Sequence, residues 1–223
     1  MITVVDYGAG NLGSVVKAFK YLGVDTKIAR TAADIASAKA LVLPGVGAFG
    51  DCMLKLEKNG FDRAVIDYIK ENRPFLGICL GFQMLFDYSE EGNEGDNIKG
   101  LSVFPGCVRL FSQDKARDKG LKIPQIGWNN ISVASESETN EIQKKSRLFK
   151  DINSGEYFYF VHSYYVDAED ESIVVAKCEY VSNFVAAVEC GNIFATQFHP
   201  EKSGEAGLKV LKNFIDIIGE PAL

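Results

Sequence analysis

The sequence has little of what a metal site, a disulfide framework or a membrane span would need. It contains only two histidines, His162 and His199, so a metal site built on imidazole ligands is not expected. Its five cysteines include no Cys-x-x-Cys pair and form no even set, which indicates a reducing compartment. No apolar run approaches the roughly 18 residues of a membrane helix, and the first residues predict a strand instead of a signal peptide. We therefore expect a cytoplasmic protein with no membrane anchor.

The composition is that of an ordinary α/β domain. Of the 223 residues, 47% are hydrophobic and 24% are charged, and a chain of this length can bury a sizeable core. The formal net charge of -6 argues against a nucleic-acid surface. We expect one domain over residues 1–223, with no nucleic-acid partner and no metal.

Strands and helices alternate in the first third of the chain, whereas the last third favours strands. Expected strands cover residues 2–5, 25–29, 40–43, 75–78, 103–111, 157–166, 173–178, 184–189 and 193–198. Expected helices cover residues 12–22, 52–58, 61–72 and 207–218, and the polar stretches 89–100, 112–120 and 134–145 are expected to be loops. This order predicts an α/β fold: a central, mostly parallel sheet flanked by helices, with an antiparallel β extension in the C-terminal half.

Cys79 lies where a short buried strand is expected to turn into a helix, between Gly77 and Gly81. This spacing is typical of a nucleophile elbow, with sulfur in place of the usual oxygen. The glycines allow a tight turn and leave room for a substrate, and a helix N-terminus favours the thiolate. An isolated cysteine is more often a buried structural residue, but in this turn a nucleophile is the better interpretation.

His199 and Glu201 follow the last expected strand. In extended backbone, residues two apart point the same way, so Glu201 could hold one imidazole nitrogen of His199 while the other nitrogen faces a nucleophile. Their place at a strand end predicts the same sheet edge as Cys79. The alternative is a solvated surface turn. His162 is the competing base, although its aromatic strand predicts a packed or pocket-lining side chain.

The Gly-rich turn Pro44–Gly50 follows another strand and could supply backbone N–H donors to an oxyanion. We expect these donors from Val46 and Gly47, together with the amide of Leu80 just after the cysteine. An ordinary tight turn is the alternative.

A rival function comes from the stretch Gly8–Gly13, which matches a dinucleotide-binding fingerprint between a strand and a helix. That fingerprint also requires an acidic residue at the end of the second strand, where this chain has Arg30. The mismatch weakens this alternative, in which Cys79 would be structural, but Arg30 could meet a phosphorylated ribose.

The segments 77–83 and 199–201 resemble the class I (triad) glutamine amidotransferases. Within that class, the stretches 6–12, 44–49, 124–129 and 160–164 resemble the glutaminase subunits of imidazole glycerol phosphate synthases, which act in histidine biosynthesis. The resemblance spans essentially the whole chain. Ile126 stands where these subunits often have Met, which should be a mild change.

The resemblance implies a single class I glutamine amidotransferase domain that needs no cofactor. Cys79 would attack the side-chain amide of L-glutamine, His199 would protonate the departing ammonia, and Glu201 would orient the imidazole. The implied glutamine-binding residues are Gly45, Gln83, His162, Ser163 and Tyr164.

The resemblance also implies a heterodimer with a (β/α)8-barrel cyclase subunit, which would use the ammonia to make imidazole glycerol phosphate and AICAR. Asn11, Trp128 and Lys202 are the expected partner-interface residues. The alternative for Trp128 is a place in the core. The same glutaminase chemistry could also serve another synthase, for example a surface-sugar amidotransferase paralogue.

Overall fold

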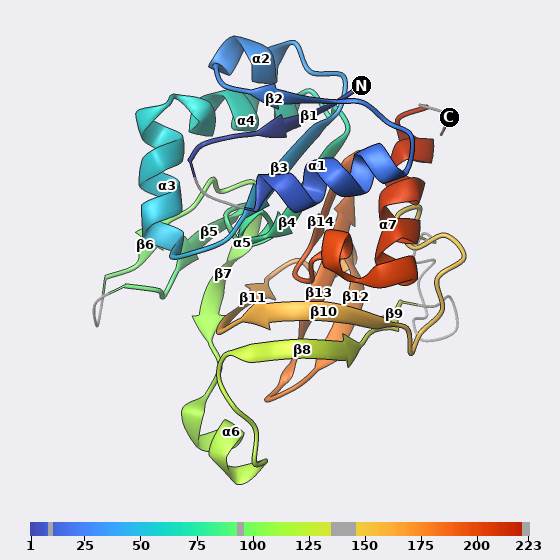
Figure 1. The fold of residues 1–223 in the computed structure, drawn as a ribbon. Coiled ribbons are helices and arrows are strands. Elements are labelled where there is room, and N and C mark those ends of the chain that lie inside the picture. Colours follow the sequence, from blue (N-terminus) through green and yellow to red (C-terminus); the bar gives the residue numbers. More distant parts are fainter. Residues whose placement is uncertain (9–10, 93–95, 135–145, 220–223) are drawn as a thin grey trace.

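The computed structural model describes residues 1–8, 11–92, 96–134 and 146–219 (Figure 1). The largest sheet in these ranges has the strand order β2-β1-β3-β4-β14-β13-β12-β9. Five neighbouring strands are parallel: β2 (Thr26–Ala29), β1 (Ile2–Val5), β3 (Leu41–Gly45), β4 (Phe75–Cys79) and β14 (Ile193–Thr196). The antiparallel extension consists of β13 (Asn183–Cys190), β12 (Val174–Glu179) and β9 (Ser132–Val133). The predicted fold class is confirmed.

Helices cover both faces of this sheet. On one face, α1 (Leu12–Tyr21) and α7 (Gly204–Ile217) pack into one buried cluster. On the other face, α2 (Ala32–Ala36), α3 (Phe49–Lys58) and α4 (Phe61–Lys70) pack into a second cluster. Thr31 and Asp34 form a capping box that starts α2. In the described part of the chain, no helix has the length and apolar character needed to cross a membrane.

The expected strand at residues 157–166 is wrong in one respect, because it is two strands in two different sheets. β10 (Tyr157–His162) pairs with β8 (Gln125–Asn130), whereas β11 (Tyr164–Ala168) joins β7 (Phe104–Leu110), β5 (Phe86–Ser89) and β6 (Ile98–Lys99). The physical reason is burial. Phe158 and Phe160 of β10 pack into the α1–α7 cluster, whereas Val166 of β11 packs into the opposite cluster. The chain changes sheets at Ser163.

The polar stretch 112–120 is not the loop that its composition predicts, because it contains the short helix α6 (Gln113–Asp118). Ser112 caps this helix by accepting a hydrogen bond from the amide of Lys115 at 3.3 Å. Ala116 is the residue of the helix whose side chain is buried. The loop expected at 89–100 includes β6, and its residues 93–95 lie outside the described residues. So do residues 135–145 of the loop expected at 134–145.

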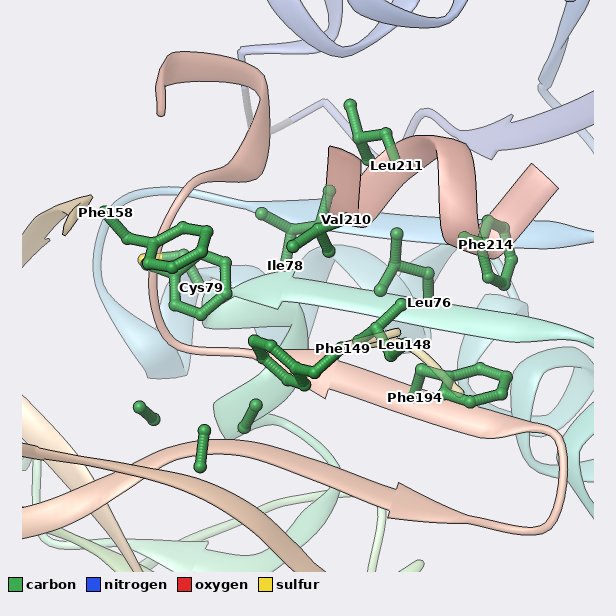
Figure 2. Close-up of a cluster of buried hydrophobic side chains, with 14 of the residues drawn as sticks. Leu76, Ile78, Cys79, Leu148, Phe149, Phe158, Phe194, Val210, Leu211 and Phe214 are labelled. Carbon is green, nitrogen blue, oxygen red and sulfur yellow. The ribbon is translucent and has the colours of Figure 1, made fainter. Parts of the chain in front are cut away.

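The core extends to Cys79. Figure 2 shows Leu76 and Ile78 of β4 facing Val210 and Phe214 of α7, with Cys79 at the end of the strand. Leu76 and Ile78 are essentially inaccessible to solvent. Packing on this scale holds the end of β4 in place, and the backbone that presents the Cys79 sulfur is therefore rigid.

Candidate active site

Cys79 stands at a strained turn between β4 and the one-turn helix α5 (Leu80–Gln83). Its φ of 53° lies in the left-handed region that non-glycine residues seldom adopt. The turn needs glycine on both sides of the cysteine. A Cβ on Gly81 would lie 1.8 Å from the Leu43 carbonyl oxygen, and one on Gly77 would lie 2.8 Å from the Gly81 oxygen. The strand–turn–helix geometry predicted for Cys79 is confirmed.

His199 and Glu201 lie close together, as their spacing predicts, but by a different backbone route. Pro200 begins a 3-10 turn, Pro200–Lys202, so Glu201 is not on an extended strand. The amide of Lys202 donates to the His199 oxygen at 3.0 Å and closes this turn. His199 Nδ1 lies 2.8 Å from Glu201 Oε1, and both side chains are almost completely buried. The other ring nitrogen, Nε2, has no hydrogen-bond partner within the described residues.

The charge on His199 is set by its neighbours. Burial alone would lower its pKa, but Cys79 and Glu201 outweigh that effect and raise the pKa from its usual 6.5 to about 10. His199 is therefore a cation at neutral pH. Because α5 is only one turn long, its dipole is small, and the imidazolium is the stronger source of positive potential at the sulfur.

His162, the competing base, is held neutral. Its ring is buried against Phe111, Phe160 and Phe184, and Nδ1 lies 2.8 Å from the Tyr164 oxygen. Burial lowers the pKa of His162 to about 4, more than the hydrogen bond to Tyr164 restores, and the nearby His199 lowers it further. His162 is thus a neutral, packed residue beside the charged His199.

Gln197 is a buried polar residue next to the sulfur that the sequence interpretation missed. Its Nε2 donates to Cys79 Sγ at 3.8 Å, while its Oε1 accepts from Gln83 Nε2 at 3.0 Å. Gln83 Nε2 also donates to the Tyr164 oxygen at 2.8 Å. Gln197 lies in the expected strand 193–198 and precedes His199 by two residues, so alternation along that strand could have indicated it, although the observed strand β14 ends at Thr196.

The Cys79 sulfur opens into a cavity of about 440 Å³. Of the residues expected at the site, its lining includes Asn11, Val46, Gly47, Cys79, Leu80, Gln83, His162, Ser163, Tyr164 and Lys202. Gly45 is not among the lining residues, because it lies behind the turn against Tyr7. No group of three His, Cys, Asp or Glu side chains within the described residues could hold a metal ion.

The lining also contains an acidic residue, Glu91, that no sequence pattern indicated. Its Oε2 accepts a hydrogen bond from the amide of Phe49, the first residue of α3, at 2.8 Å. Burial raises the pKa of Glu91 above its usual value, although this hydrogen bond opposes the shift. Glu91 was hidden because it belongs to the stretch 89–100, where only a polar loop was expected.

Trp128 lies at the surface and not in the core, since the residue is 54% exposed to solvent. Its ring meets the Tyr159 ring edge-on at 6.3 Å, and Lys202 Nζ lies 5.8 Å from the centre of the same Tyr159 ring. Trp128 lines a second cavity of about 700 Å³, which is separate from the one around Cys79. Lys202 lines the Cys79 cavity and contacts Tyr159, so it connects the two regions.

Residues 3–218 match the glutamine amidotransferase class-I family. The chain is 46% identical to the imidazole glycerol phosphate synthase subunit HisH of Syntrophotalea carbinolica, covering 97% of this chain and 100% of that protein. It is 42% identical to the chloroplastic imidazole glycerol phosphate synthase hisHF of Arabidopsis thaliana, covering 96% of this chain and 34% of that longer protein.

A similar fold occurs in a solved structure of PurLQS from Thermotoga maritima. The superposition covers 97% of this chain and 98% of that chain, with a TM-score of 0.71 and 19% sequence identity. At this identity the likeness concerns the fold alone.

The two histidines should titrate far from their usual range and in opposite directions. With the pKa of His199 near 10 and that of His162 near 4, neither imidazole should change its charge between about pH 6 and 8. Cys79→Ala should lower the pKa of His199, because one of the groups that favour the cation is removed. It should change the pKa of His162 much less. Two-dimensional NMR of ¹⁵N-labelled imidazoles would measure both. Titration of both rings near 6.5 would contradict this electrostatic assignment.

Proposed function

The chain belongs to the class-I glutamine amidotransferase family, and from that premise we propose that it is the glutaminase subunit of an imidazole glycerol phosphate synthase. It hydrolyses L-glutamine to glutamate and ammonia. The observation that carries this proposal is the buried contact of a charged His199 with Glu201, beside Cys79 at its strained turn. The full-length likeness to HisH proteins supports the choice of synthase.

In the first half of the reaction, the Cys79 thiolate attacks the carbonyl carbon of the glutamine side-chain amide. His199 is the general acid, because it is charged at neutral pH and its Nδ1 is already occupied by Glu201. Its Nε2 therefore gives the proton to the departing ammonia. The products are ammonia, a γ-glutamyl thioester on Cys79 and a neutral His199.

In the second half, the neutral His199 accepts a proton at Nε2 from a water molecule, which attacks the thioester carbonyl. Glutamate leaves, and the Cys79 thiolate and charged His199 are restored. Glu201 acts throughout by holding the ring through Nδ1 and by stabilising the imidazolium. His162 is too low in pKa to carry out these transfers near neutral pH.

The cavity supplies the remaining contacts. Backbone N–H groups of Val46 or Gly47 and of Leu80 are the proposed oxyanion donors. Glu91 offers a carboxylate for the substrate's α-ammonium group, while Gln83 and the 162–164 segment line the same space. Gly45 contributes by leaving room behind the turn, not by lining the cavity.

The partner is the cyclase subunit of the synthase, which we propose to be a (β/α)8 barrel in a heterodimer with this chain. It takes up the ammonia to make imidazole glycerol phosphate and AICAR. The proposed docking face contains Trp128, Tyr159, Lys202 and Asn11, because the exposed Trp128 and the half-buried Tyr159 adjoin Lys202 at the rim of the Cys79 cavity. A buried aromatic anchor is a common centre of binding energy in such interfaces.

Other interpretations have less support. Family membership favours glutamine hydrolysis over nucleotide binding at Gly8–Gly13, of which residues 9–10 lie outside the described residues. A surface-sugar synthase as the partner remains an alternative for the same glutaminase chemistry. All five cysteines are free, which agrees with the proposed cytoplasmic location.

Replacement of the nucleophile should abolish the glutaminase activity of the synthase and leave its cyclase activity intact. In the complex with its cyclase, Cys79→Ala should abolish glutamine-dependent synthesis but retain synthesis from added ammonium salts, since the cyclase needs only ammonia. Measuring both rates on the same preparation provides the internal control. Glutamine turnover persisting in the Cys79→Ala complex would refute the proposed mechanism.

Trp128→Ala should weaken binding of the cyclase and glutamine-driven synthesis without unfolding the isolated subunit. A central aromatic anchor typically contributes about 2 kcal/mol or more, which corresponds to a rise in Kd of about thirtyfold. The matched control is Tyr21→Ala, since Tyr21 is also an exposed aromatic residue but lies at the far end of α1. Titration calorimetry would measure both variants. Equal affinities for wild type, Trp128→Ala and Tyr21→Ala would show that the docking face is misplaced.

A further inference from the structure

Two buried side chains lie behind the proposed oxyanion turn and have no part in the reaction described above. Tyr7, just after β1, donates its hydroxyl hydrogen to the Pro44 oxygen at 3.0 Å. Cys52, in α3, donates its thiol hydrogen to the Val46 oxygen at 3.7 Å. Tyr7 is 2% exposed and Cys52 is 1% exposed, and neither lines the Cys79 cavity.

These two contacts fix the orientation of two peptide groups of the turn, Pro44–Gly45 and Val46–Gly47. A trans peptide is planar, so its C=O and N–H point in opposite directions. Holding the Val46 oxygen on the buried side directs the next amide, that of Gly47, to the other side. The cavity is on that side, because Val46 and Gly47 line it whereas Tyr7 and Cys52 do not.

Both side chains remain protonated and can act as donors at any ordinary pH. Burial raises the pKa of Tyr7, and its interaction with Cys52 raises it further. Burial also raises the pKa of the Cys52 thiol, although the contact with Tyr7 opposes part of that shift. The two groups thus lie against each other as neutral donors, each directed at a different carbonyl of the turn.

The turn needs these contacts because its own residues restrict the backbone conformation only weakly. Gly47 has a φ of 110°, a conformation that glycine reaches and leaves easily. The fit behind the turn is close, since a Cβ on Gly45 would lie 2.7 Å from the Tyr7 hydroxyl oxygen. If a carbonyl oxygen turned into the cavity, it would repel the developing oxyanion in place of stabilising it.

We propose that Tyr7 and Cys52 are positioning residues that keep the Pro44 and Val46 carbonyls out of the Cys79 cavity, and that the held Val46 carbonyl keeps the Gly47 amide of the oxyanion turn in its donor orientation. Neither residue lines the cavity in which the substrate would bind. This inference rests on the proposed glutaminase function. It leaves the Gly45–Val46 peptide, between the two held carbonyls, as the part of the turn whose orientation the pair does not fix directly.

A positioning role predicts a particular pattern of rates in the complex with the cyclase. Tyr7→Phe and Cys52→Ala each remove one donor and should lower kcat for glutamine about tenfold. This loss is smaller than the roughly 10²–10³-fold cost of removing a whole oxyanion donor. The KM for glutamine should stay within about twofold, because the turn acts on the transition state and not on substrate binding. Cys52→Ser keeps a donor and should retain most of kcat. Synthesis from ammonium salts should be unchanged in all three variants.

Alkylation of Cys79 by iodoacetamide distinguishes positioning from general damage. This reaction displaces iodide at a saturated carbon, so it forms no oxyanion and does not need the turn. Tyr7→Phe and Cys52→Ala should therefore alkylate at the wild-type rate. Cys178→Ala is the matched control, since Cys178 is equally buried but lies in β12, and it should leave kcat unchanged.

Unchanged glutamine kcat in Cys52→Ala and Tyr7→Phe would overturn the inference. So would a fall in kcat matched by an equal fall in the alkylation rate, which would indicate a distorted elbow. If Tyr7→Phe fails to fold, the comparison of Cys52→Ala with Cys52→Ser decides the matter alone, and equal kcat values would count against the inference. A wild-type complex without glutamine turnover would instead overturn the proposed function itself.

Discussion

The close approach of the Gly81 backbone to the Leu43 carbonyl oxygen is the constraint on which the site depends. Only a residue without a Cβ fits there, and only that fit lets Cys79 leave β4 with a positive φ. The parallel pairing of β14 with β4 then brings the end of the last strand beside the elbow, so His199 emerges at the same sheet edge. Helix α7 packs behind both strands and makes this arrangement rigid (Figure 2).

Burial makes the protonation states of the two histidines depend strongly on their neighbours. In a low-dielectric interior a charge must be paired, and His199 is charged because Cys79 and Glu201 both favour the cation against the effect of burial. His162 is also buried, but within the described residues its polar partner is a backbone carbonyl and no carboxylate, and it stays neutral. Two histidines in one site thus receive different protonation states from their surroundings, and only one can serve as the acid.

Local patterns in the sequence were sufficient to predict most strands and helices, the elbow at Cys79 and the proximity of His199 to Glu201, because each depends on residues close together in the chain. The features that the sequence did not predict depend on contacts between residues far apart in the chain. The division at Ser163 is decided by which of two clusters each half of the segment meets, and Glu91 reaches the cavity only through the fold of a loop that looked merely polar. Tyr7 and Cys52 are separated by 45 positions, and nothing in either local pattern indicated that they meet behind the turn.

The central claim is that Cys79, alone among the five cysteines, is a nucleophile for a glutamine-like carbonyl. The most direct measurement is to incubate the complex with an electrophilic glutamine analogue and to locate the covalent label by peptide mass spectrometry. The account predicts one label per chain, on Cys79, with labelling slowed by excess L-glutamine and absent in His199→Asn at the same exposure. Labelling spread over Cys52, Cys107, Cys178 or Cys190, or labelling of Cys79 that L-glutamine does not slow, would contradict it.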